Sequence, residues 1–506
     1  MNQDAAIPAR LHAAATAGDT DLARYLADER RREAVARVAG RIEALGIRHI
    51  YYQFVSVTGR IMGKAAPAAH WATIAGRGVQ LWYGAVADVC ADRQGNYIGY
   101  GANASELVAL PEPESFCQLP WSKSVARVFC TLFRNREEPE NAGAFLTSDC
   151  RGNLRRLHAE FEKKHGMHLR VGCEPEMMWF KRGPDGKFAG GTTRPLAYHI
   201  DQFETLFPVI DRVTQYAQAM GLDMIQGDHE DAPGQVELNI WFDEALRNAD
   251  RLTTYRQICA QVAREQHLIA TFMTKPFMGV SANGCHHNVS LWTGGEDQVN
   301  PIGIEGELPA SPQVFTYRKG GKNEFLRETG EWMPAPVGLH SIGGMIGHLP
   351  ALTALGASTV NSYRRLADLG FWAPVYRIWG LQNRTAAVRV SAPGRLEYRA
   401  VDSLVNPYLM AAGLLQAFDD GLMRKCDAGQ PESRNVYEAM EAGVKVERLP
   451  SDLREALDAL EADPVVMGAL PGEMARVFFH FKRDEWARFI ATVTEWDYDR
   501  YLEYLP

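Results

Sequence analysis

Apolar and polar residues alternate in four strand-like segments, and the polar members are unusual for a strand face. The segments read VGCEPEMMWF (171–180), HEDAPGQVELNI (229–240), NGCHHNVSLW (283–292) and GRLEYRAVD (394–402). Because residues two apart on a strand point to the same side, each segment predicts one apolar and one polar face. The polar faces gather five Glu, one His and paired Arg, in place of the Lys, Thr and Ser of a solvated face. The joint pattern therefore favours a chemical site.

The two adjacent carboxylates of the first segment need a source of positive charge. Glu174 and Glu176 share a strand face, and burying even one ionised carboxylate is costly. Oxygen-rich ligand sets with one imidazole suit divalent cations such as Mg²⁺ or Mn²⁺. We therefore predict bound divalent metal. The alternative for any single segment is an ordinary strand with one solvated face.

The remaining pattern divides the chain into three parts. Residues 1–46 are rich in Ala, Arg and Glu and predict a helical extension. Residues 47–57 are β-branched and aromatic, and Gly/Pro-punctuated sequence follows, so we predict a small α+β domain over 47–145. An N-cap signal at 147–149 precedes an apolar helical stripe (Leu154, Leu157, Phe161) that stops at Gly166. A larger domain is expected over 146–506.

Length, charge and cysteine usage narrow the class of protein. A chain of 506 residues is too long for one hydrophobic core. The formal net charge of −8 gives no electrostatic reason to expect nucleic acid or an anionic membrane as a partner. The eight cysteines form no CxxC pair, which fits reduced thiols better than disulfides or a zinc site. With neither a signal-peptide pattern nor a membrane-spanning apolar run, we expect a cytoplasmic protein.

The motifs in and between these segments resemble those of the glutamine synthetase family. They are EPE, HEDAPGQVE, KPFMGVSANGCHHNVSLW, NSYRRL, NRTAAVRV and GRLEYRAVDSLVNPYL, in the order in which the family carries them. The resemblance extends from about residue 47 to the C-terminus. It implies an α+β fold in which a small β-grasp-like N-terminal domain precedes a glutamine-synthetase-type catalytic domain. In that domain an antiparallel sheet forms a funnel-shaped active site.

The resemblance also implies which residues bind metal. One metal site would comprise Glu176, Glu230 and Glu237. A second site would comprise Glu174, His286 and Glu397. The alternative for a single histidine is a core position with satisfied hydrogen bonds. We expect Mg²⁺ or Mn²⁺, with two or three ions per site.

Further motif positions match residues that contact ATP and glutamate. Those on the nucleotide side are Asn288, Ser290, Arg384, Arg389 and Arg395. Those on the glutamate side are Glu176, Ala282, Arg365, Trp372 and Arg399. Arg384, Glu397, Arg399, Trp372 and Ser56 match positions next to the reacting groups. The alternative for the arginines is a set of structural ion pairs.

The chemistry implied by the family is amide formation driven by ATP. Phosphorylation of the γ-carboxylate of glutamate gives a mixed anhydride that an amine can attack, with release of ADP and phosphate. Metal ions hold the reacting groups, and arginines neutralise charge on the phosphoryl group in flight. In the family, active sites lie between subunits of stacked hexameric rings, so we expect a homo-oligomer, a dodecamer.

The sequence departs from the family where ammonium would be bound. The family pattern F-x-D-x-x-G reads FVSVTG here, with Ser56 in place of Asp, and G-[YF]-E-A-P reads GFWAPV, with Trp372 in place of Glu. Ser281 and Ala282 also replace residues that help to bind the amino group of glutamate. A tryptophan offers apolar area and a π-face, which suit an organic amine. Burial of each methylene contributes about 0.8 kcal/mol.

These departures favour the branch of the family that ligates glutamate to amines, such as the γ-glutamylmethylamide and γ-glutamylanilide synthetases. The acceptor would be an alkylamine or an aromatic amine, and Asp231 or Asp368 are candidate bases for an alkylammonium. Trp372 could instead pack in its own segment while another carboxylate binds ammonium. The alternatives are therefore a glutamine synthetase that uses ammonia, a non-catalytic scaffold and a guanidino-type phosphotransferase.

Overall fold

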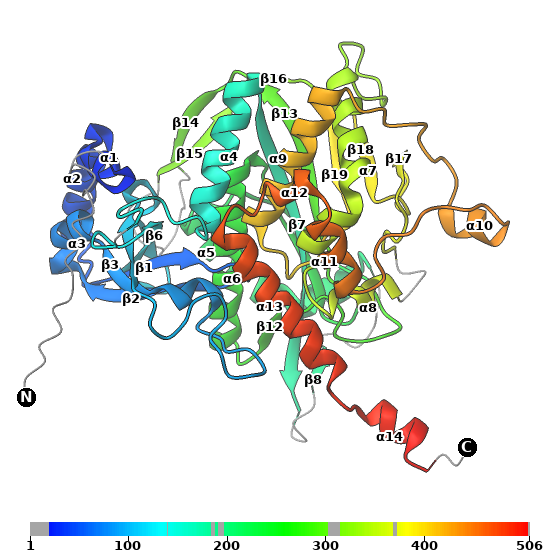
Figure 1. Ribbon diagram of the computed structural model, residues 1–506, viewed down its shortest axis with the longest axis horizontal. Helices are drawn as coiled ribbons and strands as arrows, with labels where there is room; N and C mark the ends of the chain where they lie inside the picture. Colours follow the sequence, from blue (N-terminus) through cyan, green and yellow to red (C-terminus); the bar gives the residue numbers. More distant parts are fainter. Residues whose placement is uncertain are drawn as a thin grey trace, which may run out of the picture.

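The computed structural model describes residues 20–138, 140–183, 188–190, 197–301, 314–367 and 372–503. It has two sheet-based parts, a six-stranded sheet near the N-terminus and an eleven-stranded sheet in the larger part (Figure 1). The predicted α+β fold is confirmed. Of the expected helical extension, α1 (Asp21–Ala27) and α2 (Glu29–Ala44) are helices, whereas 1–19 lie outside the described residues.

The N-terminal sheet is mixed. Its order is β2 (Ile61–Pro67), β1 (His49–Val55), β6 (Ser122–Phe133), β4 (Glu106–Pro111) and β3 (Val79–Trp82), with β5 (Cys117–Leu119) paired to β6. β1 and β6 run parallel, and the other pairs run antiparallel. Ile50, Tyr52 and Phe54 of β1 are buried, so alternate residues face the core shared with α2 and α3 (Trp71–Arg77).

The larger sheet carries the polar segments. Its order is β17 (Trp379–Leu381), β18 (Val388–Ala392), β19 (Arg395–Tyr398), β13 (Cys285–Thr293), β7 (His168–Arg182), β10 (Gln235–Ile240) and β9 (Met224–His229). Short strands β8 (Phe188–Gly190), β11 (Asp243–Glu244) and β12 (Ile269–Thr271) pair with β7, and β16 (Lys322–Asn323) pairs with β13. β14 (Glu296–Pro301) and β15 (Val314–Lys319) form a separate pair. Every pair along the main path is antiparallel except β17 with β18.

The larger part of the chain also contains helices. They are α4 (Cys150–His165), α5 (Ile200–Ala219), α6 (Ala245–Glu265), α7 (Pro336–Gly356), α8 (Ser362–Ala367), α9 (Pro407–Arg424), α10 (Val436–Glu441), α11 (Leu453–Glu461), α12 (Pro464–Met467), α13 (Glu473–Ile490) and α14 (Glu495–Tyr501). The predicted helix after residue 149 is confirmed as α4, because the Asp149 side chain accepts from Gly152 N–H and Gly166 ends the helix in the left-handed conformation. α7 and α9 approach closely at Gly344 and Gly421, where a Cβ on Gly344 would lie 2.1 Å from Ala417 O.

A buried ion-pair network joins the two parts of the chain. Glu112, which follows β4, pairs with Arg151 and Arg155 of α4, and Arg151 also pairs with Asp250 of α6 at 2.8 Å. Burial alone would raise the pKa of Glu112, but the two arginines and Thr131 lower it to about 2. The carboxylate therefore stays ionised at the junction.

Within the described residues, every helix is too short or too polar to cross a membrane.

Candidate active site

The polar faces of the larger sheet line a pocket of about 800 Å³. Most of the residues predicted for the site line it: Glu174, Glu176, Glu230, Glu237, Ala282, His286, Arg365, Trp372, Arg384, Arg389, Arg395, Glu397 and Arg399. They come from segments more than two hundred residues apart in the chain. The sheet, and not sequence proximity, therefore assembles the pocket.

Strand register explains how these residues meet. Glu237 of β10 lies opposite Glu176 of β7, and His286 of β13 lies opposite Glu174 of β7. Glu397 of β19 lies opposite Asn288 of β13 on one side and opposite Arg389 of β18 on the other. Since directly opposed residues point to the same face, the antiparallel pairing gathers the acidic groups on one side of the sheet.

Two ligand clusters stand out in the pocket. Donor atoms of Glu174, Glu237 and His286 lie within 4.8 Å of one another, as do those of Asp228, Glu230 and Glu237. Sequence reasoning missed Asp228, although a signal existed: in GDHED it stands two residues before Glu230, and it pairs with Glu237 across β9 and β10. The described residues thus offer one more carboxylate than predicted.

The protonation properties of these groups fit a cation site. Burial, followed by the charge of Glu230, raises the pKa of Glu176 to about 8. Burial and Asp228 raise the pKa of Glu230 to about 7, and burial and Glu174 raise that of Asp228 to about 6. Burial and three neighbouring glutamates hold the pKa of Glu237 well above its usual value. Carboxylates crowded in this way are stabilised by a divalent cation, so the donor set fits Mg²⁺ or Mn²⁺.

His286 and Glu397 have lowered pKa values, in contrast to the four carboxylates described above. Burial and the charge of Arg399 lower the pKa of His286 well below its usual value, so the ring is neutral and can act as a metal ligand. Burial would raise the pKa of Glu397, but Arg399, His286 and Arg389 lower it. Arg389 Nη1 lies 2.8 Å from Glu397 Oε2, and Arg399 pairs with the other oxygen. Glu397 therefore remains ionised.

The arginines of the pocket are held in different ways. Arg365 Nη1 donates to Val401 O at 3.0 Å, and its Nη2 lies 3.5 Å from His286 Nε2. Arg395 Nε donates to Ser391 Oγ at 2.9 Å. Arg384 and Arg395 are exposed, whereas Arg365 and Arg399 are buried.

Trp372 lies on the pocket wall, and the residue is 57% exposed. Its backbone is left-handed (φ 60°), and Arg399 Nη2 donates to its carbonyl at 3.3 Å. Ser281 also lines the pocket, and its Oγ donates to Asp231 Oδ2 at 2.5 Å, so a carboxylate lies beside Ala282. Asp368 lies outside the described residues.

Asn288 and Ser290 do not line the pocket. Asn288 Nδ2 donates to Glu174 Oε1 at 2.8 Å, and therefore orients a metal-site carboxylate. Ser290 Oγ accepts from Trp292 Nε1 at 2.8 Å, further along β13.

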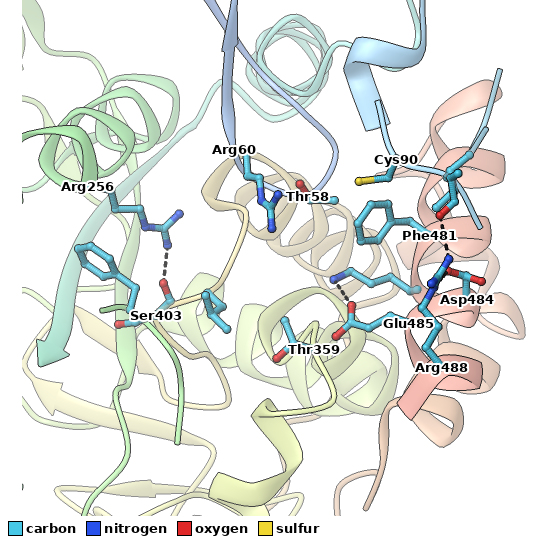
Figure 2. Close-up of a pocket in the computed structure, with 16 residues that line it drawn as sticks. Thr58, Arg60, Cys90, Arg256, Thr359, Ser403, Phe481, Asp484, Glu485 and Arg488 are labelled. Atoms are coloured by element: carbon cyan, nitrogen blue, oxygen red, sulfur yellow. Dashed lines mark hydrogen bonds and ion pairs between the residues drawn. The ribbon is translucent and has the colours of Figure 1, made fainter. Parts of the chain in front are cut away.

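Ser56 does not line this pocket. Its side chain has no exposed surface, and Ser56 Oγ bonds Thr58 Oγ1 at 3.0 Å and accepts from Arg60 N–H at 3.2 Å. The turn after β1 borders a different pocket of about 660 Å³, where Thr58 and Arg60 face Phe481 of α13 (Figure 2). The Ser56 hydroxyl is thus bonded within its own turn and lies outside the carboxylate pocket, and its position next to the reacting groups stays a prediction.

Comparisons of the sequence and of the structure with known proteins find relatives over most of the chain. The family model for the glutamine synthetase catalytic domain matches residues 147–303 and 315–501. A glutamine synthetase of Methanocaldococcus jannaschii is 32% identical over 415 residues, covering 80% of this chain and 84% of that protein. One from Pyrococcus furiosus is 34% identical over 428 residues, covering 79% and 87%. The solved structure of a GmaS–ADP complex is 32% identical, with a TM-score of 0.78 over 92% of this chain and 99% of that one.

Proposed function

The chain belongs to the glutamine synthetase family, and from this premise we propose that it joins the γ-carboxylate of glutamate to an organic primary amine. The family relationship makes the chain an ATP-dependent ligase that uses divalent metal such as Mg²⁺ or Mn²⁺. The finer assignment concerns the acceptor, an alkylamine such as methylamine or an aromatic amine such as aniline. Trp372 in the pocket wall is the observation that carries it.

The proposed reaction has two steps. A γ-carboxylate oxygen of glutamate takes the γ-phosphoryl group of ATP, and ADP leaves. The amine nitrogen then attacks the γ-carbonyl carbon, phosphate leaves with the electrons of the broken C–O bond, and nitrogen loses a proton. Bound divalent cations would supply Lewis-acid polarisation and charge neutralisation.

Different residues of this chain would bind ATP and glutamate. Arg384, Arg389 and Arg395 would neutralise phosphate charge, while Arg365 and Arg399 would orient the glutamate carboxylates. Metal would be held by the clustered donors Glu174, Glu176, Glu230, Glu237, His286 and Glu397, with Asp228 as an added donor. The ionised state of Glu397 fits this role, because a carboxylate held by two arginines is fixed in position.

Trp372 supports an organic amine in preference to ammonium. An exposed indole in the pocket wall gives an alkyl or aryl group an apolar surface and a π-face, and a compact ammonium ion gains little from the apolar area. The similarity to GmaS, a γ-glutamylmethylamide synthetase, supports the same choice.

A second candidate is glutamine synthesis from ammonia. Asp231 lines the pocket beside Ala282 and could hold ammonium or take its proton, and the curated relatives described above are called glutamine synthetases. In this case Trp372 would pack in its own segment.

An amine panel decides between the two candidates. ADP release would be measured with ATP, glutamate, Mg²⁺ and, in turn, ammonium, methylamine, ethanolamine, isopropylamine and aniline, and the amide identified by mass spectrometry. We expect the highest kcat/KM with one of the organic amines. The highest value with ammonium would replace the proposal by glutamine synthesis. A stable phosphorylated product without amide would indicate a phosphotransferase, and no turnover with any amine a scaffold.

We also base our proposals for subunit assembly and cellular location on the family. Proteins of this family are typically oligomeric, and we propose a cytoplasmic homododecamer with active sites between subunits. Sedimentation of the purified chain tests the subunit number.

A further inference from the structure

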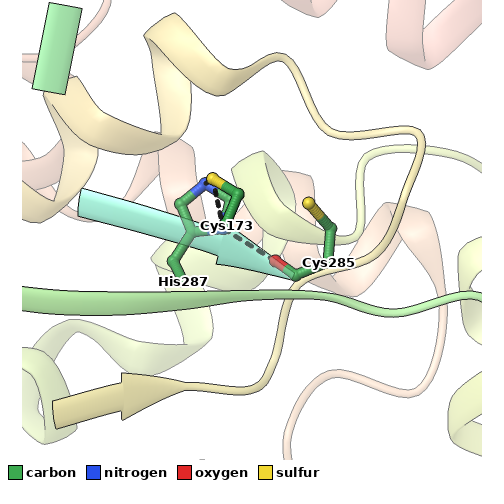
Figure 3. Close-up of side chains that lie close together, drawn as sticks. All are labelled: Cys173, Cys285 and His287. Atoms are coloured by element: carbon green, nitrogen blue, oxygen red, sulfur yellow. Dashed lines mark hydrogen bonds between the residues drawn. The ribbon is translucent and has the colours of Figure 1, made fainter. Parts of the chain in front are cut away.

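A third cluster of metal-ligating side chains lies on the face of the sheet opposite the carboxylate pocket. Cys173 of β7 and Cys285 and His287 of β13 alternate with Glu174 and His286, so they point to the opposite face of the same two strands. Figure 3 shows these three side chains close together. Cys173 pairs directly with His287, and Cys285 is two residues before His287 on the same face. All three side chains are buried, with exposures of 2%, 0% and 1%.

The donor atoms of the cluster converge. One donor atom from each residue, two thiol sulfurs and one ring nitrogen, lies within 4.8 Å of the other two. Cys173 Sγ lies 3.7 Å from His287 Nε2. In a tetrahedral zinc site with Zn–S bonds of about 2.3 Å, two sulfur ligands lie about 3.8 Å apart. A contraction of about 1 Å or less would thus bring these three groups into a coordination shell.

The histidine is oriented as a ligand. His287 Nδ1 lies 2.7 Å from the carbonyl oxygen of Cys285, and because a carbonyl can only accept, Nδ1 carries the proton. Nε2 is therefore the unprotonated ring nitrogen, and Cys173 Sγ lies at similar distances from both ring nitrogens, 3.8 Å from Nδ1 and 3.7 Å from Nε2. Metal-binding histidines typically donate their second N–H in this way. Asn248 Oδ1, 2.9 Å from Cys173 Sγ, places an oxygen donor beside the cluster.

We propose that Cys173, Cys285 and His287 bind a thiophilic metal ion, Zn²⁺ or Cu⁺, in a site separate from the carboxylate pocket. Two thiolates and one imidazole suit soft ions, whereas the carboxylates on the other face suit Mg²⁺ and Mn²⁺. Both thiols lose a proton and each forms one metal–sulfur bond, with no change in oxidation state. The ion would cross-link β7 to β13, the strands that also present Glu174 and His286.

The strand register favours a metal over a disulfide. Cys173 and Cys285 are diagonal neighbours across an antiparallel pair, and diagonal positions lie roughly 7–8 Å apart. That separation exceeds the usual Cα–Cα span of a disulfide, about 4.4–6.8 Å.

The wild-type protein provides the first test. Cells producing the full chain would be grown with added zinc or copper, and the protein would be washed with EDTA to strip the open carboxylate pocket. Because the cluster is buried, its ion should survive the wash. We expect about one retained ion per chain with sulfur neighbours at about 2.3 Å by X-ray absorption. Which metal is retained distinguishes Zn²⁺ from Cu⁺.

Variants provide the second test. Cys173→Ser and Cys285→Ser should lose the retained ion, while Cys130→Ser, a buried free cysteine of β6, should keep it. A cobalt-loaded wild-type protein should show a thiolate-to-cobalt charge-transfer band that both cluster variants lack. The proposal is overturned if neither metal survives the wash, if the retained ion has no sulfur neighbour, or if mass spectrometry finds Cys173 joined to Cys285. The wild-type absorption measurement decides even where a variant fails to fold.

Discussion

At the residue scale, Trp372 is the side chain expected to select the amine. Replacing it by Glu puts a carboxylate on the pocket wall in place of an exposed indole. We expect kcat/KM for ammonium relative to methylamine to rise about tenfold or more, since about 1.4 kcal/mol of added attraction for a cation suffices. Steady-state ADP release on the amine panel measures the change.

The matched control for this substitution is Trp332→Glu. Trp332 is also partly exposed (40%) but does not line the pocket. Trp332→Glu should leave the ranking of the amines by kcat/KM unchanged. If Trp372→Glu also leaves the ranking unchanged, Trp372 has only a packing role.

Glu237 is shared by both carboxylate clusters, so its neutral isostere should have a large effect. Glu237→Gln keeps the shape and length of the side chain but replaces the charged carboxylate, a metal ligand, by a neutral amide. We expect activity with every amine to fall by at least about 100-fold, because even changes beyond the direct ligands cost 10–100-fold. Isothermal titration with Mn²⁺ should show weakened binding in parallel.

Glu204→Gln, on the exposed surface of α5, controls for the loss of one negative charge. It should bind Mn²⁺ and turn over like the wild type. Full Mn²⁺ affinity in Glu237→Gln would remove Glu237 from the metal site.

At the element scale, the antiparallel sheet shows what could be read from the sequence. Alternation in four segments, together with the family resemblance, located most residues of the pocket because strand periodicity fixes which residues share a face. The pairing partners depend on which strands become neighbours. Asp228 was missed for that reason, since only the pairing of β9 with β10 places it beside Glu237.

Turn geometry and non-local clusters were harder to predict. Ser56 matched a motif position, but its neighbours Thr58 and Arg60 satisfy its hydroxyl within the turn. Cys173 and Cys285 stand more than a hundred residues apart, so no local spacing indicated that β7 and β13 would bring them together.

The junction between β4 and α4 gives an element-scale prediction. Glu112→Gln leaves the buried guanidinium of Arg151 with one carboxylate partner fewer, and breaking a buried pair costs about 3–5 kcal/mol. The free energy of unfolding should fall by about this amount in urea denaturation. Glu114→Gln is the control, because its pair with Arg37 is exposed and should change stability by less than about 0.5 kcal/mol.

The ion pairs of Glu112 should also make the stability of the folded chain depend on pH under acidic conditions. The pKa of Glu112 is about 2 in the folded chain and near 4.5 when unperturbed, so its contribution is complete above about pH 4.5 and is lost as the pH falls toward 2. The stability difference between wild type and Glu112→Gln should therefore shrink over that window. A constant difference down to pH 2 would assign the effect to packing.

At the scale of the whole molecule, metal binding and overall stability should be linked through pH. Without metal, the carboxylates of the pocket have raised pKa values, about 8 for Glu176 and about 7 for Glu230, against an unperturbed value of 4.5. A raised folded-state pKa contributes stability below the unfolded value that is lost as pH rises through the folded value. The metal-free protein should therefore lose stability between about pH 4.5 and 8.

Mg²⁺ should reverse this loss, because it binds the ionised carboxylates. The increase in Tm on adding Mg²⁺ should be small near pH 5 and should grow toward pH 8, where 100-fold excess over Kd corresponds to about 2.7 kcal/mol. Scanning calorimetry of chelator-treated protein, with and without added Mg²⁺, measures this rise in Tm. We expect a smaller rise for Glu237→Gln than for the wild type. An increase that does not depend on pH would mean that Mg²⁺ stabilises the molecule somewhere other than at the pocket carboxylates.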